Sequence, residues 1–530
     1  MAVANIKRFA RFGPALAMTS AMATATPIAA HQTWVEVGEM PGEDVMRVVD
    51  HGVDKALAEL PRVVNATLQR SGVPGAAVAV VHGGKTIFAQ GFGVRELGKA
   101  ALIEPGTVFQ IASLSKSLTA AVTAVQVTKG VVSWDDPVAR YLPGFRLSDP
   151  FVSTHATVGD FMAHHSGLPF AAGDDLEDLG YSRKQIIERL RHLPLDRFRA
   201  SYHYANFGTT IGAQAVAAAA NTEWEDLVEQ SLFKPLGMTS TSARHADYIA
   251  RPNRAVLHAL EGGRFQPLFD RNPDEQSPAG GVSSTAVDMA QWLKFMLAGG
   301  KHDGRALASP ESLLAAVSPH SFSSPPHSMA TRPGFYGYGF NTGASANGRT
   351  VFSHSGAFLL GAATAFQIIP SADVGIVVLT NGSPVGAAES IAMEFMDILQ
   401  YGEPLRDWFA AYNGLMRAYF EPDGDLSGKS PPAQPKAAQA FDVYTGRYEN
   451  DYFGAIDIAV EDGQLVLTIG PRREKLALAH WDGDTFAITP RSENAPEGSR
   501  SSAVFSTADG RASAVTIDYL NDNGMATWRR

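Results

Sequence analysis

Two side chains that can catalyse acyl transfer together lie in the segment Ser113-Leu-Ser-Lys116. Apolar residues recur at helical spacing from Leu114 to Val125, which predicts a buried helix, and residues three apart share one helix face. A serine hydroxyl needs a base to become a nucleophile, and a lysine can serve where burial or a neighbouring cation keeps its amine neutral. The helix N-terminus also favours negative charge on the attacked carbonyl. We predict that Ser113 is the nucleophile and that Lys116 handles its proton.

The S-x-x-K spacing is short enough to arise by chance, and a second match occurs at Ser231-Leu-Phe-Lys234. Pro235 and Gly237 follow this match. They place it at a helix end or in a loop, where the positive end of a helix dipole is missing. We therefore interpret Ser231 as a structural residue.

A tyrosine and an asparagine form a second candidate pair in Tyr204-Ala-Asn206, at the start of a predicted helix. A tyrosine beside a lysine can carry a proton to the leaving group, and an asparagine amide can both donate to and accept from a substrate amide. Two further Y-x-N matches, Tyr448-Glu-Asn450 and Tyr519-Leu-Asn521, lie beyond a predicted linker. We predict a catalytic Tyr204 and a substrate-binding Asn206.

The tripeptide His354-Ser355-Gly356 lies on a predicted edge strand, where backbone and side-chain donors can flank a substrate. The same tripeptide begins at His165, but there it follows a helical pattern and precedes Leu168-Pro169. That context predicts a turn at a helix end. We assign substrate binding to the copy at His354.

The order of S-x-x-K, Y-x-N and H-x-G, at wide spacing, resembles the β-lactamase and penicillin-binding-protein superfamily, in its class C, DD-peptidase and esterase branch. The resemblance runs from about residue 73 to 398 and includes three connecting segments: Asp135-Asp136-Pro137, His165-Ser-Gly-Leu-Pro169 and Pro278-Ala-Gly-Gly-Val-Ser-Ser284. It implies an acyl-enzyme on Ser113, with Lys116 and Tyr204 as acid and base.

The same resemblance implies the substrate contacts. Asn206, His354, Ser355 and Gly356 would bind substrate, and the backbone N–H groups of Ser113 and Ala357 would form the oxyanion hole. It implies no metal and no organic cofactor. The adjacent His164 and His165 lack the spacing of a zinc motif.

One departure from the family pattern bears on the substrate. The chain has no K-x-G triplet, so His354 stands where β-lactamases offer a lysine to the substrate carboxylate. The charge of a histidine near neutral pH depends on its neighbours. Relatives with histidine here imply a peptidase or amidase that acts on peptides with D- or unusual residues. A carboxylesterase, a weak β-lactamase and a non-catalytic penicillin-sensor protein are the alternatives.

The expected fold is α/β (α+β). A β-lactamase-like antiparallel sheet flanked by helices, together with an all-helical subdomain, is expected over residues 31–420. Residues 421–440 hold four prolines without an apolar period, which predicts a linker. Short β-like runs in residues 441–530 predict a small antiparallel β-barrel, which resembles a lipocalin-like domain. Capping the active site, oligomerisation and binding of an apolar ligand are three possible roles for it.

Composition limits the partners. The net charge is −10 and no dense basic stripe follows the first dozen residues, so nucleic acid is not an expected partner. Basic residues followed by a short apolar stretch predict a signal peptide over residues 1–30, and hence a periplasmic or secreted protein. No later stretch approaches the ~20 apolar residues of a membrane span. A small molecule or peptide is the expected substrate.

Overall fold

The computed structural model describes residues 42, 44 and 48–530. The predicted signal peptide, residues 1–30, lies outside them. No helix in the described part of the chain is long and apolar enough to cross a bilayer. The chain divides into two compact units, which are described separately. Residues 133–223 and 417–530 form one unit, and the other combines the described residues up to 132 with residues 224–416.

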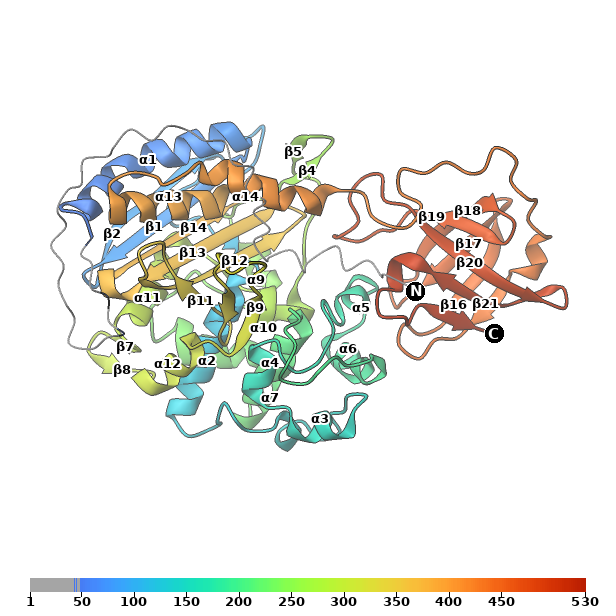
Figure 1. The fold of residues 1–530 in the computed structure, drawn as a ribbon, viewed down its shortest axis with the longest axis horizontal. Helices are drawn as coiled ribbons and strands as arrows, with labels where there is room; N and C mark the ends of the chain where they lie inside the picture. Colours follow the sequence, from blue (N-terminus) through green and yellow to red (C-terminus); the bar gives the residue numbers. More distant parts are fainter. Residues whose placement is uncertain (1–41, 43, 45–47) are drawn as a thin grey trace. The chain divides into compact units, whose positions relative to one another are not determined.

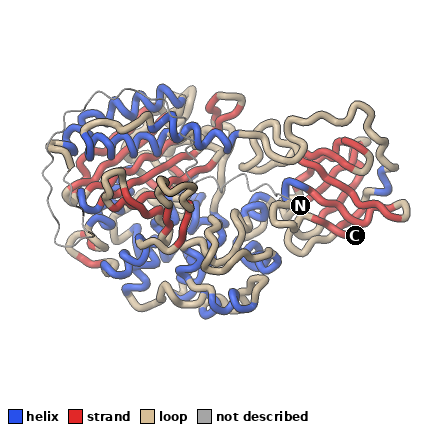
Figure 2. The backbone as a smooth tube through the Cα atoms, in the orientation of Figure 1, coloured by secondary structure: helices blue, strands red, loops and turns tan. Residues whose placement is uncertain are grey.

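The second of these units is built on an eight-stranded antiparallel sheet (Figures 1 and 2). Its strand order is β2-β1-β14-β13-β12-β11-β10-β9. Segments from both ends of the unit therefore pair at its centre, where β1 lies beside β14. The strands are β1 (Gly75–His82), β2 (Lys85–Gly93), β9 (Ser321–Ser324), β10 (Gly334–Tyr336), β11 (Asn341–Ala344), β12 (Thr350–Phe358), β13 (Ala362–Ile369) and β14 (Val374–Thr380).

Helices cover both faces of this sheet, which explains why the central strands are almost continuously apolar (Figure 1). Helices α1 (Gly52–Ser71) and α13 (Ala387–Tyr401) pack on one face, while α2 (Leu114–Thr128) and α11 (Ala286–Leu297) pack on the other. The core under α1 and α13 joins residues such as Leu60, Val78, Val378 and Phe395, all fully buried. Burial of each such side chain contributes about 1.5–3 kcal/mol to the stability of the folded unit.

Shorter elements complete this unit. They are β3 (Phe109–Gln110), α8 (Trp224–Val228), α9 (His245–Ala250), β4 (Ala259–Glu261), β5 (Arg264–Gln266), α10 (Ser277–Gly280), β6 (Ser283–Ser284), β7 (Lys301–His302), β8 (Arg305–Ala306), α12 (Pro310–Val317) and α14 (Trp408–Met416). Strands β3 and β6 pair with each other just before α2. This pairing anchors the chain that enters α2.

The other unit contains the helical segment that the sequence predicts. Its helices are α3 (Pro150–His155), α4 (Val158–Met162), α5 (Asp174–Asp178), α6 (Arg183–Arg189) and α7 (Asn206–Ala219). Side-chain caps begin several of them, and Thr157 and Asp160 form a capping box at the start of α4. Helices α4 and α7 pack together.

The C-terminal part of that unit is an antiparallel barrel in which eight strands pair in sequence order. Backbone hydrogen bonds between Glu449 and Arg529 join its first and last strands, which nearly closes the sheet. The strands are β15 (Gly446–Tyr448), β16 (Ile456–Glu461), β17 (Gln464–Ile469), β18 (Glu474–Asp482), β19 (Thr485–Ile488), β20 (Ser501–Ala508), β21 (Arg511–Ile517) and β22 (Thr527–Arg529).

The predicted linker, residues 421–440, contains no helix or strand. Leu426 within it is buried against Trp481 and Ala487 of the barrel. The backbone N–H of Lys436 also donates to Asp482, 2.7 Å away. The segment thus packs along the barrel.

Candidate active site

The nucleophile and base predicted from the sequence are in contact. The Lys116 Nζ donates to Ser113 Oγ at 3.1 Å and to the carbonyl oxygen of Ala279 at 2.9 Å. Lys116 is fully buried, whereas Ser113 is partly exposed. The Ala279 carbonyl, from α10, therefore holds the amine beside a hydroxyl that remains open to a ligand.

A strained turn presents Ser113 at the start of α2. Ala112 has φ 47°, a left-handed conformation that costs energy in a non-glycine residue and is common at functional sites. Hydrogen bonds hold the turn: Ser115 Oγ donates to the Ala112 carbonyl at 2.7 Å, and Thr364 Oγ1 of β13 donates to the Ile111 carbonyl at 2.8 Å. The β3–β6 pairing holds the chain just before it.

Strand β12 passes next to the nucleophile. A Cβ atom added to Gly356 would lie 2.9 Å from the Ser113 backbone nitrogen and would also collide with the Ile111 carbonyl. Only glycine allows this approach. Strand β11 pairs with β12 from Thr350 to Ser353, so this part of β12 lies in the interior of the sheet. From His354 onward β12 pairs only with β13 among the described residues, so this part of β12 is an edge strand. The prediction of an edge strand holds for the tripeptide itself.

His354 is an uncharged residue in this site. It is 4% exposed, and burial, followed by repulsion from Lys116 when that amine is protonated, lowers the pKa of His354 to about 3. Its Nδ1 lies 2.7 Å from the Ser355 carbonyl, which can only accept, so Nδ1 carries the proton. The hydroxyl of Tyr336 then donates to Nε2, at 2.8 Å. The imidazole is therefore a neutral hydrogen-bonding group.

The alternation of β12 separates the predicted substrate-binding residues. His354 pairs across to Phe366, whose ring contacts Trp292 of α11, so His354 faces α2 and α11. Ser355 pairs with Ala365 in the core under α13, and its side chain interacts with Glu389 of α13. Burial raises the pKa of Glu389 to about 7 despite that contact. Ser355 and Ala357 can therefore reach the Ser113 side only through their backbones.

Tyr204 and Asn206 lie at the start of α7, in the other compact unit. The Tyr204 carbonyl accepts from the Ala171 N–H at 2.9 Å, and its ring lies 4.5 Å from that of His164. Asn206 Nδ2 donates to Asp174 Oδ2 at 3.0 Å. The chain from Ala171 to Asp174, at the start of α5, thus contacts both residues. Their catalytic and binding roles stay predictions.

Residues 54–395 match the family described as Beta-lactamase, and residues 430–526 match a Domain of unknown function (DUF3471). The chain belongs to the β-lactamase family. It is a serine hydrolase. Among the relatives of this hydrolase, Unguisins hydrolase ungD′ of Aspergillus campestris is 26% identical over 417 residues, 76% of each chain. Unguisins hydrolase ungD of Aspergillus violaceofuscus is 24% identical over 475 residues, 81% of this chain and 82% of that one.

Solved structures confirm the β-lactamase fold. The octameric penicillin-binding protein homologue from Pyrococcus abyssi has a TM-score of 0.57 at 19% identity, over 87% of this chain and 98% of that chain. SurE with D-Leu has a TM-score of 0.52 at 19% identity, over 90% of this chain and 99% of that chain. A class C β-lactamase from Rhodobacter sphaeroides has a TM-score of 0.52 at 23% identity, over 65% of this chain and 98% of that chain. These structures confirm the predicted fold class, and the family match over residues 54–395 confirms the predicted superfamily.

The repeated motifs of this β-lactamase family member have structural roles. Ser231 is buried and accepts from Gln126 Nε2 at 2.7 Å, while Lys234 is 68% exposed and pairs with Glu229. His165 lies just after α4, in the predicted turn, and its Nε2 is 2.8 Å from Oδ1 of Asp160. Burial alone would raise the pKa of Asp160, but hydrogen bonds from His165 and Arg199 hold it well below its usual range.

Sequence reasoning missed three residues that contact the predicted site residues. The Ala279 carbonyl binds Lys116, Tyr336 fixes the His354 ring, and Asp174 orients the Asn206 amide. Ala279 lies in the Pro278–Ser284 segment that the family resemblance singled out. Nothing local marks Tyr336 or Asp174, because their partners are remote in the chain.

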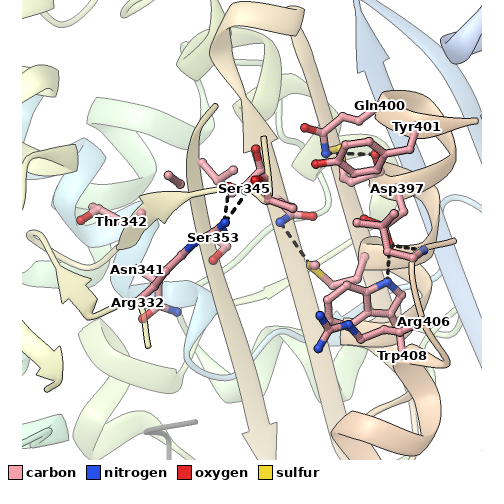
Figure 3. Close-up of a pocket in the computed structure, with 18 residues that line it drawn as sticks. Arg332, Asn341, Thr342, Ser345, Ser353, Asp397, Gln400, Tyr401, Arg406 and Trp408 are labelled. Carbon is pink, nitrogen blue, oxygen red and sulfur yellow. Dashed lines mark hydrogen bonds between the residues drawn. The ribbon is translucent and has the colours of Figure 1, made fainter. Parts of the chain in front are cut away.

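Figure 3 shows a pocket elsewhere in the serine hydrolase, with a volume of about 340 Å³. It lies on the face of β12 that Ser353 shares with Ser355, beside α13 and the chain that leads to α14. Asp397 on its wall accepts from the Trp408 indole and from the Leu405 N–H. Since His354 faces the other side of the sheet, this pocket is separate from the Ser113 site.

Proposed function

We propose that this serine hydrolase cleaves amide bonds in peptides that contain D- or otherwise unusual residues, through an acyl-enzyme on Ser113. The observation that carries the proposal is the contact between the buried Lys116 amine and the Ser113 hydroxyl, 3.1 Å apart. An amine withdrawn from water is harder to keep charged, and a neutral amine at this distance can take the hydroxyl proton.

The proposed reaction has two steps. In acylation, Ser113 Oγ bonds to the scissile carbonyl carbon and its proton passes to Lys116. The backbone N–H groups of Ser113 and Ala357 are the proposed donors to the oxyanion. The C–N bond then breaks as the proton reaches the leaving amine, with Tyr204 as its proposed carrier. In deacylation, water adds to the ester, the acid product leaves and Ser113 regains its proton.

The state of His354 supports an amide or ester substrate over a carboxylated β-lactam. A lysine in its place would offer a fixed positive charge to a carboxylated β-lactam, whereas this neutral imidazole offers only hydrogen bonds. The names of two relatives, both called unguisins hydrolases, agree with a hydrolytic reaction, and one structural neighbour was solved with D-Leu, a D-amino acid.

A carboxylesterase is the second candidate, and the same neutral His354 favours it. An ester substrate brings no carboxylate that needs a cation. Its alkoxide leaving group also departs with less help from a proton donor than an amine does, so Tyr204 would matter less.

A substrate panel tests the proposal. The purified protein is compared on D- and L-amino-acid amides, short peptides, p-nitrophenyl esters and a chromogenic cephalosporin, with Ser113→Ala protein as the blank. We expect the highest kcat/KM on an amide or peptide with a D-residue. Turnover of esters alone would identify a carboxylesterase. Failure of a fluorophosphonate to form an adduct at Ser113 would instead identify a non-catalytic binding protein.

His354→Ala is expected to lower kcat/KM by similar factors for a substrate with a free carboxylate and for its matched methyl ester, because the wild-type residue carries no charge to lose. The ratio of the two kcat/KM values should stay constant between pH 5 and pH 8, since the pKa of His354, about 3, lies below this range. His354→Lys adds a cation and should shift the ratio several-fold toward the carboxylate. A wild-type ratio that rises as the pH falls to 5 would show a charged imidazole.

A further inference from the structure

His164 is a buried histidine in the loop that follows α4. It is 3% exposed, and its φ of 58° is left-handed, a conformation that histidine adopts more readily than most non-glycine residues. Backbone strain of this kind is common at functional sites. The next residue, His165, binds Asp160, so the two adjacent histidines have different partners.

The residues before and after Tyr204 are both bound by His164. The His164 carbonyl accepts from the backbone N–H of His203 at 2.9 Å. Its Nδ1 accepts from the backbone N–H of Ala205 at 3.3 Å, in a buried contact. The Tyr204 carbonyl is in turn bound by the Ala171 N–H at 2.9 Å. Three hydrogen bonds, two of them to His164, therefore fix the backbone that carries the Tyr204 side chain.

The imidazole of His164 also contacts the Tyr204 ring. The two ring centroids are 4.5 Å apart, with 42° between the ring planes. The ring of Tyr202 lies edge-on to the same imidazole, with centroids 5.8 Å apart. Contacts of this kind favour particular relative orientations of the rings. The imidazole therefore restricts the rotation of the Tyr204 side chain as well as its backbone.

These contacts meet at the entry to α7. Ala205 is the residue that precedes this helix, and its methyl side chain provides no cap. Helices α4 and α7 pack together in the same compact unit, which brings the loop after α4 to the start of α7 (Figure 1). The Nδ1 of His164 thus binds the chain where it turns from Tyr204 into the helix.

The hydrogen bond from Ala205 also defines the tautomer of His164. A backbone N–H can only donate, so Nδ1 carries no proton, and the proton of the neutral imidazole is on Nε2. Asparagine has an acceptor, Oδ1, as many bonds from its backbone as Nδ1 is in histidine, and it tolerates the left-handed backbone. Phenylalanine has a ring of similar shape but no acceptor. These two residues can therefore separate the hydrogen bond from the ring contact.

We propose that His164 is a positioning residue for Tyr204, acting through the hydrogen bond to Ala205 and the contact between the rings. The inference rests on the proposed function, in which Tyr204 carries a proton to the leaving group. A leaving amine needs that proton, whereas p-nitrophenolate is stable enough to leave without it. Loss of the His164 acceptor should therefore slow the cleavage of amides and spare the cleavage of an activated ester.

His164→Phe in the full chain removes the acceptor and keeps a ring. We expect kcat/KM on the best amide substrate to fall about tenfold, as for a buried donor left unpaired, and kcat/KM on a p-nitrophenyl ester to change less than about twofold. The amide-to-ester ratio does not depend on how much of the protein folds, so destabilisation alone would leave it at the wild-type value. His164→Asn keeps an acceptor and should hold the ratio within about twofold of wild type.

His165→Phe is the matched control, because the Nε2 of His165 binds Asp160. Its loss should lower the thermal midpoint and leave the amide-to-ester ratio unchanged. A ratio that falls as far in His165→Phe as in His164→Phe would overturn the inference, because it would show a general effect of disturbing the turn.

A double-mutant cycle with Tyr204→Phe completes the test. Tyr204→Phe should itself lower the amide-to-ester ratio, and His164→Phe should lower it no further in that background. Independent, multiplicative losses would overturn the inference, as would an equal loss on both substrates in His164→Phe. If Tyr204→Phe leaves the ratio unchanged, the role proposed for Tyr204 is wrong and the inference falls with it. If wild-type Ser113 takes no fluorophosphonate label, the proposed function itself fails, so these failures are distinguishable.

Discussion

Ser113→Ala is expected to lower kcat/KM by a factor of about 10⁴ or more, the usual loss when an activated nucleophile is removed. Ser113 is partly exposed and the change deletes a single oxygen, so the fold and the thermal midpoint should be preserved. The effect is measured as kcat/KM on the best substrate of the panel, with intact-mass analysis of the fluorophosphonate adduct. No adduct should form on the variant.

Ser231→Ala is the matched control, because Ser231 begins the other S-x-x-K match. Its hydroxyl is buried against Gln126, so the variant should lose about 1–3 kcal/mol of stability and keep its activity per folded molecule. Should Ser231→Ala inactivate the enzyme and Ser113→Ala spare it, the assignment of the nucleophile is wrong. Equal residual activity in both variants would indicate a third nucleophile.

Lys116→Met has the second-largest expected effect, a fall of about 10²- to 10⁴-fold in kcat/KM, the usual contribution of general acid–base catalysis. Methionine fills most of the same buried volume without the amine that contacts Ser113 Oγ and the Ala279 carbonyl. The labelling rate of Ser113 should fall with kcat/KM, because both reactions need the hydroxyl proton to be removed. Lys116→Arg should be inactive as well, since a guanidinium does not give up its proton.

Lys234→Met is the control for that change. Lys234 is exposed and pairs with Glu229, and a surface ion pair contributes only about 0–1 kcal/mol, so near wild-type activity is expected. If Lys116→Met labelled at the wild-type rate, another group would be removing the proton. The pH dependence of labelling in Tyr204→Phe would then be the next measurement, because Tyr204 is the other predicted proton carrier.

Much of this protein is determined locally by its sequence. The apolar spacing after Ser113 is enough to predict helix α2, and an i,i+3 pair on a helix must share a face, so the contact with Lys116 follows without knowledge of the remaining fold. The copies at Ser231 and His165 could be set aside for a similar reason, because Pro235 and Leu168-Pro169 mark helix ends. Local patterns of short strands were also enough to predict the C-terminal barrel.

Tertiary structure alone decided the charge of His354, the direction of Ser355 and the support of Asn206. A histidine's ionisation depends on what buries it, and here burial and the Lys116 charge come from segments far apart in the chain. The face that Ser355 presents depends on which helix covers each side of β12. The sequence left the role of the barrel open among several possibilities. The hydrogen bond from the Tyr181 hydroxyl to the Phe453 carbonyl of the barrel joins residues 272 positions apart, and no local pattern encodes such a pairing because only packing of the folded chain brings them together.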